Sequence, residues 1–207
     1  METLYFFPSC VYRDERPEWV ESARVVIDEY LASLEDKDAV YPVCQSGAMF
    51  DDRILDLTRH IGVSAANILR DQGFEMRNRR TVLTEIWGQQ FQRAGRHDPH
   101  VHAYGAQISG FYFIDVPEGS ALPMITDPRP GKRQINLEVR ASDDISYASD
   151  NIVFKVVPGT LLLMNSWLPH AFTIHNSDEP LKFIHFNLGI IDAEAPIGSC
   201  APLAEVI

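Results

Sequence analysis

The hydrophobic period of this chain changes near residue 80, and this change limits the folds available to it. Before that point, apolar residues recur every three or four positions in two stretches that begin at Pro17 and Asp51, which predicts two amphipathic helices. Their apolar positions are Trp19, Ala23, Val26, Tyr30 and Leu34, and then Ile54, Leu57, Ile61, Ala65 and Ile68. After that point, short runs of branched and aromatic residues alternate with turn residues, which predicts strands.

The predicted strands lie within residues 80–92, 106–116, 117–134, 151–157, 160–167 and 170–190, and the last stretch is interpreted as a hairpin around residues 176–179. Many short strands with tight turns, and helices only in front, favour a cupin-like jelly roll. We predict one mainly β domain over residues 1–207. Residues 1–80 would form a helical front packed on the sheet, and residues 81–207 the β core.

The acidic balance of the chain argues against nucleic acid as a partner. The formal net charge is −11, and a negative field repels phosphate backbones. The only compact basic cluster in the sequence is Arg129, Lys132 and Arg133, which suits at most one small anion.

The sequence also indicates a compartment. It contains no run of about 18 apolar residues and no signal-like N-terminus, so we expect no membrane association. Cys10, Cys44 and Cys200 lie far apart and fit neither a disulfide framework nor a metal knuckle. We therefore expect a cytoplasmic protein.

One segment, HDPHVHAYGAQISGFYF at residues 97–113, places three of the seven histidines directly before a predicted strand. Side chains two positions apart in an extended chain share a face, so His100 and His102 project together, with Asp98 beside them if the strand begins early. A third ligand must come from elsewhere. His170 is the best candidate, because it follows a strongly apolar strand and Pro169 would turn it inward. Such a set leaves open positions on one side of a metal, which suits iron that handles oxygen and a co-substrate.

The histidines also have plainer interpretations. An H-x-H pair on an exposed strand is most often two solvated side chains, so spacing alone does not establish a metal site. We interpret His97 as an exposed loop residue and His60 as a surface residue of a helix. His175 and His185, on late strands, are interpreted as hydrogen-bonded structural residues.

The segments around these histidines resemble a known family. HVHAYGAQISGFYFIDVP, ITDPRP, VPGTLLLMNSWLPHAF and FIHFNLG are similar to the pattern H-x-H-P-x-x-x-x-S-G-x-Y-Y, F-x-D-P-R, G-x-L-x-x-F-P-S-W-L-x-H and S-F-N of 2-oxoglutarate- and Fe(II)-dependent oxygenases. The opening LYFFPSCVY also resembles that family, so the likeness spans nearly the whole chain. It implies a double-stranded β-helix, with Fe(II) held by His100, His102 and His170 and with Asp127 and Arg129 near the mouth of the site.

The resemblance also implies an oxidative reaction. Fe(II), O2 and the co-substrate 2-oxoglutarate would carry the chemistry, releasing succinate and oxidising a C–H bond of the substrate, while the protein fixes geometry and excludes water. Tyr112, Phe113 and Trp167 would line the pocket, together with Asp127. The plainer interpretation of the three aromatic residues is that they belong to the core of a jelly roll.

The sequence departs from the wider superfamily at one ligand position. Where an aspartate or glutamate is usual, this chain has His102, so either the site has three histidines or Asp98 or Asp127 supplies a carboxylate. Three neutral ligands leave the metal with its full charge. That favours a chelating dianion such as 2-oxoglutarate, but it also suits a dioxygenase that needs no co-substrate.

The sequence also departs from the family at the residue that would hold the far carboxylate of 2-oxoglutarate. The family's usual arginine falls near Leu181, with Lys182 beside it. A buried carboxylate needs a partner, and we favour Lys182 at the start of the last long strand. Arg129 is the rival, because its planar fork matches a carboxylate, and Tyr112 is the remaining donor if neither acts.

Other functions compatible with the sequence are kept as alternatives. They are a cupin-like metal-binding or sugar-processing protein, a 2-oxoglutarate-independent three-histidine dioxygenase, and an interaction protein without chemistry. The chain has no Gly-rich phosphate loop, G-x-S-x-G or H-E-x-x-H motif. We expect a small-molecule or peptide substrate, contacted by loops near residues 40–50, 88–99 and 140–150, and leave a homodimer open.

Overall fold

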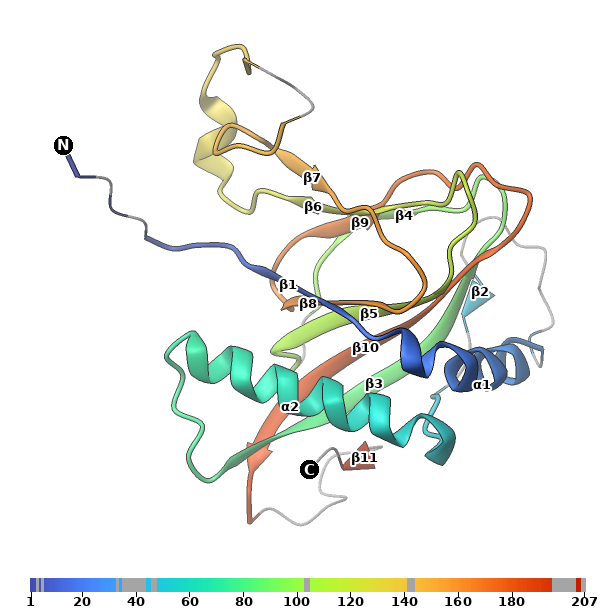
Figure 1. Ribbon diagram of the computed structural model, residues 1–207. Coiled ribbons are helices and arrows are strands. Elements are labelled where there is room, and N and C mark those ends of the chain that lie inside the picture. The colour runs from blue at the N-terminus through green and yellow to red at the C-terminus, as the bar shows by residue number, and fades with distance from the viewer. Residues whose placement is uncertain are drawn as a thin grey trace.

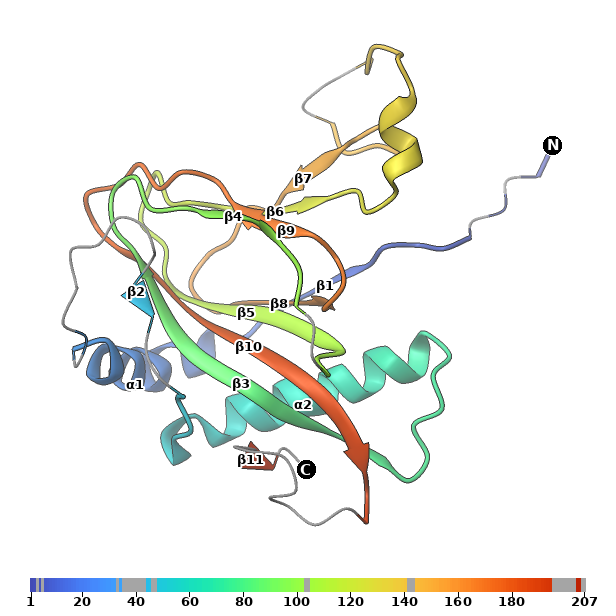
Figure 2. The same cartoon turned by 180° about the vertical axis from the view of Figure 1, so that it is seen from behind.

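The computed structural model describes residues 1–2, 4, 6–32, 34, 44–45, 48–102, 105–140, 144–194 and 204–205. Two antiparallel sheets form the body, and two helices cover one face of the larger sheet (Figure 1, Figure 2). The helices are α1 (Val20–Ala32) and α2 (Leu55–Asp71), with 3-10 turns at Pro17–Trp19, Asp52–Ile54 and Pro130–Gln134. The strands are β1 (Val11–Glu15), β2 (Cys44–Gln45), β3 (Arg79–Phe91), β4 (His97–His100), β5 (Ile108–Asp115), β6 (Pro123–Thr126), β7 (Asn151–Val153), β8 (Thr160–Asn165), β9 (His170–Phe172), β10 (Leu181–Asp192) and β11 (Ala204–Glu205).

The strand order is that of a double-stranded β-helix. The larger sheet runs β1-β8-β5-β10-β3-β11, with β2 also paired to β3, and the smaller sheet runs β4-β9-β6-β7. From β3 to β10 the chain moves back and forth between the sheets, so strands adjacent in sequence mostly lie in opposite layers. The jelly roll predicted from the sequence is confirmed.

Both predicted helices are present, and they form a layer on the larger sheet. The Asp51 side chain accepts a hydrogen bond from the backbone N–H of Arg53, which caps the turn that leads into α2. The apolar face of α1 consists of Val20, Ala23, Val26, Ile27 and Leu31, all buried. These residues pack against the outer face of the sheet, which includes Leu163, Ile184 and Phe186.

A second core fills the space between the sheets. Its members are mainly aromatic and aliphatic and include Phe91, Phe111, Phe113, Leu162, Met164, Phe172, Leu181 and Phe183. The rings of Phe172 and Phe183 are stacked, with centroids 4.9 Å apart. These residues come from β3, β5, β8, β9 and β10, so the inner core joins the smaller sheet to the larger one.

Two expectations about local structure need correction. The turn near residues 176–179 does not close a hairpin, because β9 pairs with β4 and β6 whereas β10 pairs with β3 and β5. A turn signal marks a reversal of the chain but does not tell whether the next strand joins the same sheet. The front of the chain is not wholly helical either, since β1 pairs along its whole length with β8.

Some residues named in the sequence-based expectations lie outside the part of the chain that the structure describes. Cys10 is a free cysteine, whereas Cys200 and the side chains of Cys44 and Arg133 lie outside the described part. In the predicted substrate loops, residues 40–43, 46–47 and 141–143 also lie outside it. Within the described residues, no helix has both the length and the apolar character that a bilayer crossing requires.

Candidate metal centre

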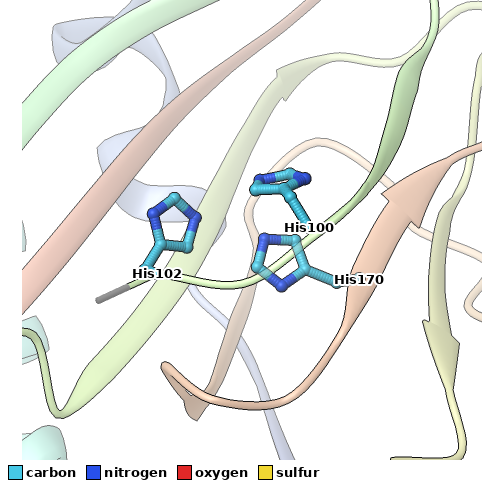
Figure 3. Close-up of side chains that lie close together, drawn as sticks. All are labelled: His100, His102 and His170. Carbon is cyan, nitrogen blue, oxygen red and sulfur yellow. The ribbon is translucent and has the colours of Figure 1, made fainter.

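Three histidines converge where the smaller sheet meets the barrel interior. His100 ends β4, His170 begins β9, and the two residues lie opposite each other in the antiparallel ladder. His102 follows two residues after His100, and its backbone N–H donates to the Ser166 carbonyl at 2.9 Å. One ligand nitrogen from each ring lies within 4.8 Å of the others, and Figure 3 shows the three rings gathered around one space.

Backbone carbonyls orient two of the rings. The Nδ1 atom of His170 lies 3.0 Å from the Leu168 carbonyl oxygen, and Nδ1 of His100 lies 2.9 Å from the Asp98 carbonyl oxygen. A carbonyl can only accept, so each Nδ1 carries the proton and each Nε2 is left as a lone-pair donor. The Nε2 atoms of His102 and His170 are buried and have no hydrogen-bond partner. Buried nitrogen atoms of this kind suit metal ligation.

Asn187 orients the third ring. Its amide nitrogen lies 3.2 Å from Nδ1 of His102 and also donates to Glu85, and its Oδ1 is buried without a partner. Ligation through Nε2 of His102 requires a proton on Nδ1 and therefore an acceptor beside it. A half-turn of the Asn187 amide supplies Oδ1 as that acceptor, and the exposed Glu85 carboxylate is then free to turn to water.

The imidazoles of His102 and His170 are neutral at physiological pH. Burial lowers the pKa of His102 to about 4 and, acting more strongly, that of His170 to about 3. Burial also lowers the pKa of His97 and His185. Because only the neutral ring offers a lone pair to a metal, burial holds His102 and His170 in the state that binds one.

The carboxylates considered as alternative ligands are engaged elsewhere. The Asp98 side chain is 62% exposed and lies 3.6 Å from the Arg96 guanidinium. Asp127 forms a bidentate pair with Arg129, whose hydrogen bonds hold the pKa of that carboxyl at about 2. Within the part of the chain that the structure describes, neither aspartate groups with the triad, and the three histidines alone form a potential metal-binding set.

Comparison with known proteins agrees with this geometry. A family model described as "Putative 2OG-Fe(II) oxygenase" matches residues 85–187, a segment that contains all three histidines. The chain belongs to the 2OG-Fe(II) oxygenase family. Its members are enzymes named for 2-oxoglutarate and Fe(II), and this chain is therefore an oxygenase of that family. No curated protein sequence matches the chain.

Solved structures of other 2OG-Fe(II) oxygenases share the fold. The non-heme alpha ketoglutarate dependent epimerase SnoN from nogalamycin biosynthesis superposes with a TM-score of 0.62 at 12% identity, covering 87% of this chain and 76% of that chain. A prolyl-4-hydroxylase of Pseudomonas putida has a TM-score of 0.55 at 9% identity, and the match covers 87% of this chain and 93% of that chain. HygX from Streptomyces hygroscopicus, solved with nickel and 2-oxoglutarate bound, has a TM-score of 0.57 at 14% identity. The match covers 87% of this chain and 83% of that chain.

The donor set of this 2OG-Fe(II) oxygenase fits the metal in the family name. Three neutral imidazole nitrogens, two of them buried without a partner, are ligands of the kind that iron accepts, and with no protein carboxylate in the set the metal keeps its full positive charge.

The residues predicted to anchor 2-oxoglutarate do not lie beside the triad. Lys182 projects from β10 toward α1, where its Nζ binds Asp28 at 2.6 Å and lies 3.6 Å from Asp115. Tyr112 belongs to the core on the helix side of the sheet, and its hydroxyl donates to the Arg16 carbonyl at 2.6 Å. Both assignments are corrected, because strand alternation turns these side chains away from the barrel interior.

The other predicted residues are also placed differently from expectation. The Arg129 side chain is 60% exposed and paired with Asp127 at the end of β6. Phe113 faces the barrel but is a fully buried core residue, packed on Phe111 and Phe183. Trp167 is 50% exposed on the turn that precedes His170, so it does not form a buried wall.

Sequence reasoning missed several neighbours of the triad. The His185 ring lies 4.8 Å from the His102 ring and 4.1 Å from the Trp87 ring, measured between centroids, and its Nε2 lies 3.2 Å from the Ser109 hydroxyl. Period-two counting from Asn187 along β10 would have placed His185 on the same face. His97, interpreted as a loop residue, packs its ring against that of His100 in a tilted arrangement, with centroids 4.2 Å apart.

Proposed function

We propose that this protein is an Fe(II)- and 2-oxoglutarate-dependent dioxygenase whose metal is bound by Nε2 of His100, His102 and His170. The observation that carries the proposal is the convergence of three imidazoles, with buried, unpaired Nε2 atoms on two of them. Family membership supports the same cofactors, and the absence of a carboxylate from the described triad supports a site with three histidines.

The residues of this chain would hold and orient the reacting groups. Bound iron and 2-oxoglutarate supply the oxidation, in which O2 is consumed and the oxo acid is decarboxylated to succinate. The Leu168 and Asp98 carbonyls fix the rings of two ligands, and Asn187 fixes the third. Phe111, whose ring centroid lies 5.6 Å from that of His170, excludes water from the inner side of the site.

We propose C–H hydroxylation of a small molecule or peptide as the reaction. The net charge of −11 supports a substrate other than nucleic acid. A cytoplasmic location and a homodimer stay predictions.

Uncoupled turnover tests the proposal without knowledge of the substrate. The wild-type protein is incubated with Fe(II), ascorbate, O2 and 2-oxoglutarate, and succinate is measured against a metal-free control. We expect slow succinate formation, equal in a His60→Ala variant, because His60 lies on α2 and pairs with Asp14. If there is neither succinate nor a visible absorption band on anaerobic addition of 2-oxoglutarate, a co-substrate-independent dioxygenase or a cupin-like protein becomes the better account.

A further inference from the structure

Among the residues that the structure describes, no lysine or arginine is buried in the barrel interior, where the far carboxylate of a bound oxo acid would lie. Every lysine and arginine side chain that the structure describes is at least partly exposed to solvent. At the start of β10, the side chains that face the interior are Leu181 and Phe183, both fully buried and apolar. Lys182, between them, is held by Asp28 on the opposite side of the sheet.

The triad itself lowers the need for such a cation. Three neutral histidines leave the metal with two positive charges, and 2-oxoglutarate carries two negative charges, so metal and co-substrate neutralise each other. What the far carboxylate then requires is hydrogen-bond donors, because a buried carboxylate without donors is costly. Neutral N–H groups can supply these hydrogen bonds, because hydrogen bonds to the charged form of a carboxyl group stabilise that form.

Trp87 provides a donor in this region. It lies on β3 directly opposite His185 in the ladder, and its ring centroid is 6.4 Å from that of His102. Its indole Nε1 is buried and has no hydrogen-bond partner within the described part of the chain. An indole nitrogen can only donate, so this buried N–H lacks an acceptor that a ligand would supply.

The other polar groups nearby suit a carboxylate less well. Asn187 is already engaged in orienting the His102 ring, so its amide is assigned to the ligand and not to the co-substrate. The Ser109 hydroxyl is shared between His185 and the Phe186 carbonyl. Trp87 thus combines burial, proximity to the ligand rings and an unused donor.

We propose that the indole N–H of Trp87 binds the far carboxylate of 2-oxoglutarate in place of a basic residue. In 2-oxoglutarate, two methylene groups separate the far carboxylate from the keto group, whose oxygen would chelate the metal. Trp87 and His102 both contact the His185 ring. The inference rests on the proposed function, because it assumes an oxo acid chelated at the triad.

Anaerobic binding measurements test this role without turnover. Fe(II)-loaded wild-type, Trp87→Phe and Trp19→Phe proteins are titrated with 2-oxoglutarate and with 2-oxobutanoate, which lacks the far carboxylate, and the visible absorption band is followed. We expect Trp87→Phe to bind 2-oxoglutarate about tenfold to a hundredfold more weakly than wild type, as for loss of a hydrogen bond to a charged group. Its affinity for 2-oxobutanoate should be unchanged. Trp19→Phe should match wild type for both ligands, because Trp19 packs on His60.

Three outcomes would contradict the proposal, and they have different meanings. Equal affinities of Trp87→Phe and wild type for 2-oxoglutarate would overturn the role of Trp87 alone. Equal losses for both ligands would mean that the side chain supports the metal site and not the far carboxylate. If the wild type binds neither ligand, the proposed function fails together with this inference.

A measurement on the intact side chain covers the case in which Trp87→Phe does not fold. The three tryptophans give three indole N–H signals in an NMR spectrum of the Zn(II)-loaded protein. Trp19→Phe and Trp167→Phe identify two of them and so assign the third to Trp87. We expect 2-oxoglutarate, but not 2-oxobutanoate, to move the Trp87 signal downfield. A Trp87 signal that stays in place would overturn the proposal.

Discussion

His100 lies directly opposite His170 in the antiparallel pair formed by β4 and β9. The backbone ladder therefore sets the separation of two candidate ligands before any metal binds. His102 is tied in the same way, through its backbone hydrogen bond to Ser166. A preformed site of this kind keeps small the ordering cost of metal binding.

The contact between Asn187 and His102 gives a first prediction. Asn187→Leu removes the polar group that orients the His102 ring, and we expect iron affinity to fall about tenfold to a hundredfold, as is typical for partners that orient a ligand. Competition with a chelator measures the affinity. Asn165→Leu is the matched control, because this buried asparagine bonds Gln72 away from the triad and should leave iron affinity unchanged. An unchanged affinity in Asn187→Leu would remove Asn187 from the site.

Burial of His170 predicts a pH dependence of stability. Its pKa is about 3 in the folded protein because of desolvation, against an ordinary value of 6.5. Below pH 6.5 the unfolded chain binds a proton that the folded chain does not. The free energy of unfolding of the metal-free protein should therefore fall as the pH decreases from 7 toward 4, with His170 contributing up to about 1.4 kcal/mol per pH unit.

Urea unfolding at several pH values checks this contribution. His170→Leu removes the titrating group while keeping the site apolar, so its free energy of unfolding should depend less steeply on pH than that of wild type. Equal slopes for the two metal-free proteins would show that His170 is not held neutral by burial.

Lys182 is predicted to be structural. Lys182→Met leaves Asp28 and Asp115 without their shared cation, and we expect a loss of about 1 kcal/mol in the free energy of unfolding. Anaerobic affinity for 2-oxoglutarate should stay within about twofold of wild type, since the ammonium points toward α1. Exposed Lys155→Met serves as the control for loss of one positive charge. A large loss of 2-oxoglutarate affinity confined to Lys182→Met would reinstate it as the anchor.

The aspartates near the site should not be ligands. Asp98→Asn and Asp127→Asn remove each carboxylate charge with little change in shape, and both proteins should bind one iron per chain. Asp127→Asn should also lose stability, because it breaks the bidentate pair with Arg129. Loss of stoichiometric iron in either folded variant would show that a carboxylate completes the metal site.

Local patterns in the sequence predicted the elements of the fold but not every pairing between them. The period of apolar residues identified both helices and most long strands, because burial of one face imposes that period. The prediction that β9 and β10 form a hairpin was wrong, because the sheet that a strand joins depends on partners distant in the sequence. β1 was missed because VYRDE has little apolar character and is defined by its pairing with β8.

For the site, the sequence predicted the residues that share a strand face and missed those whose direction depends on register. His100 and His102 lie two apart, so an extended chain turns both rings to one side. Tyr112 and Phe113 are neighbours on β5 and cannot both face the barrel, and Phe113 is the one that does. A register shift between Lys182 and Phe183 in the pairing with β5 makes the direction of Lys182 hard to infer from the sequence.

The iron content of a His170 variant decides whether the three histidines form the metal site. Wild-type, His170→Ala and His60→Ala proteins are loaded anaerobically with Fe(II), freed of excess metal and analysed for iron per folded chain, with folding checked by circular dichroism. We expect one iron per chain in wild type and in His60→Ala and almost none in His170→Ala. A folded His170→Ala protein that retains one iron per chain would contradict the three-histidine site.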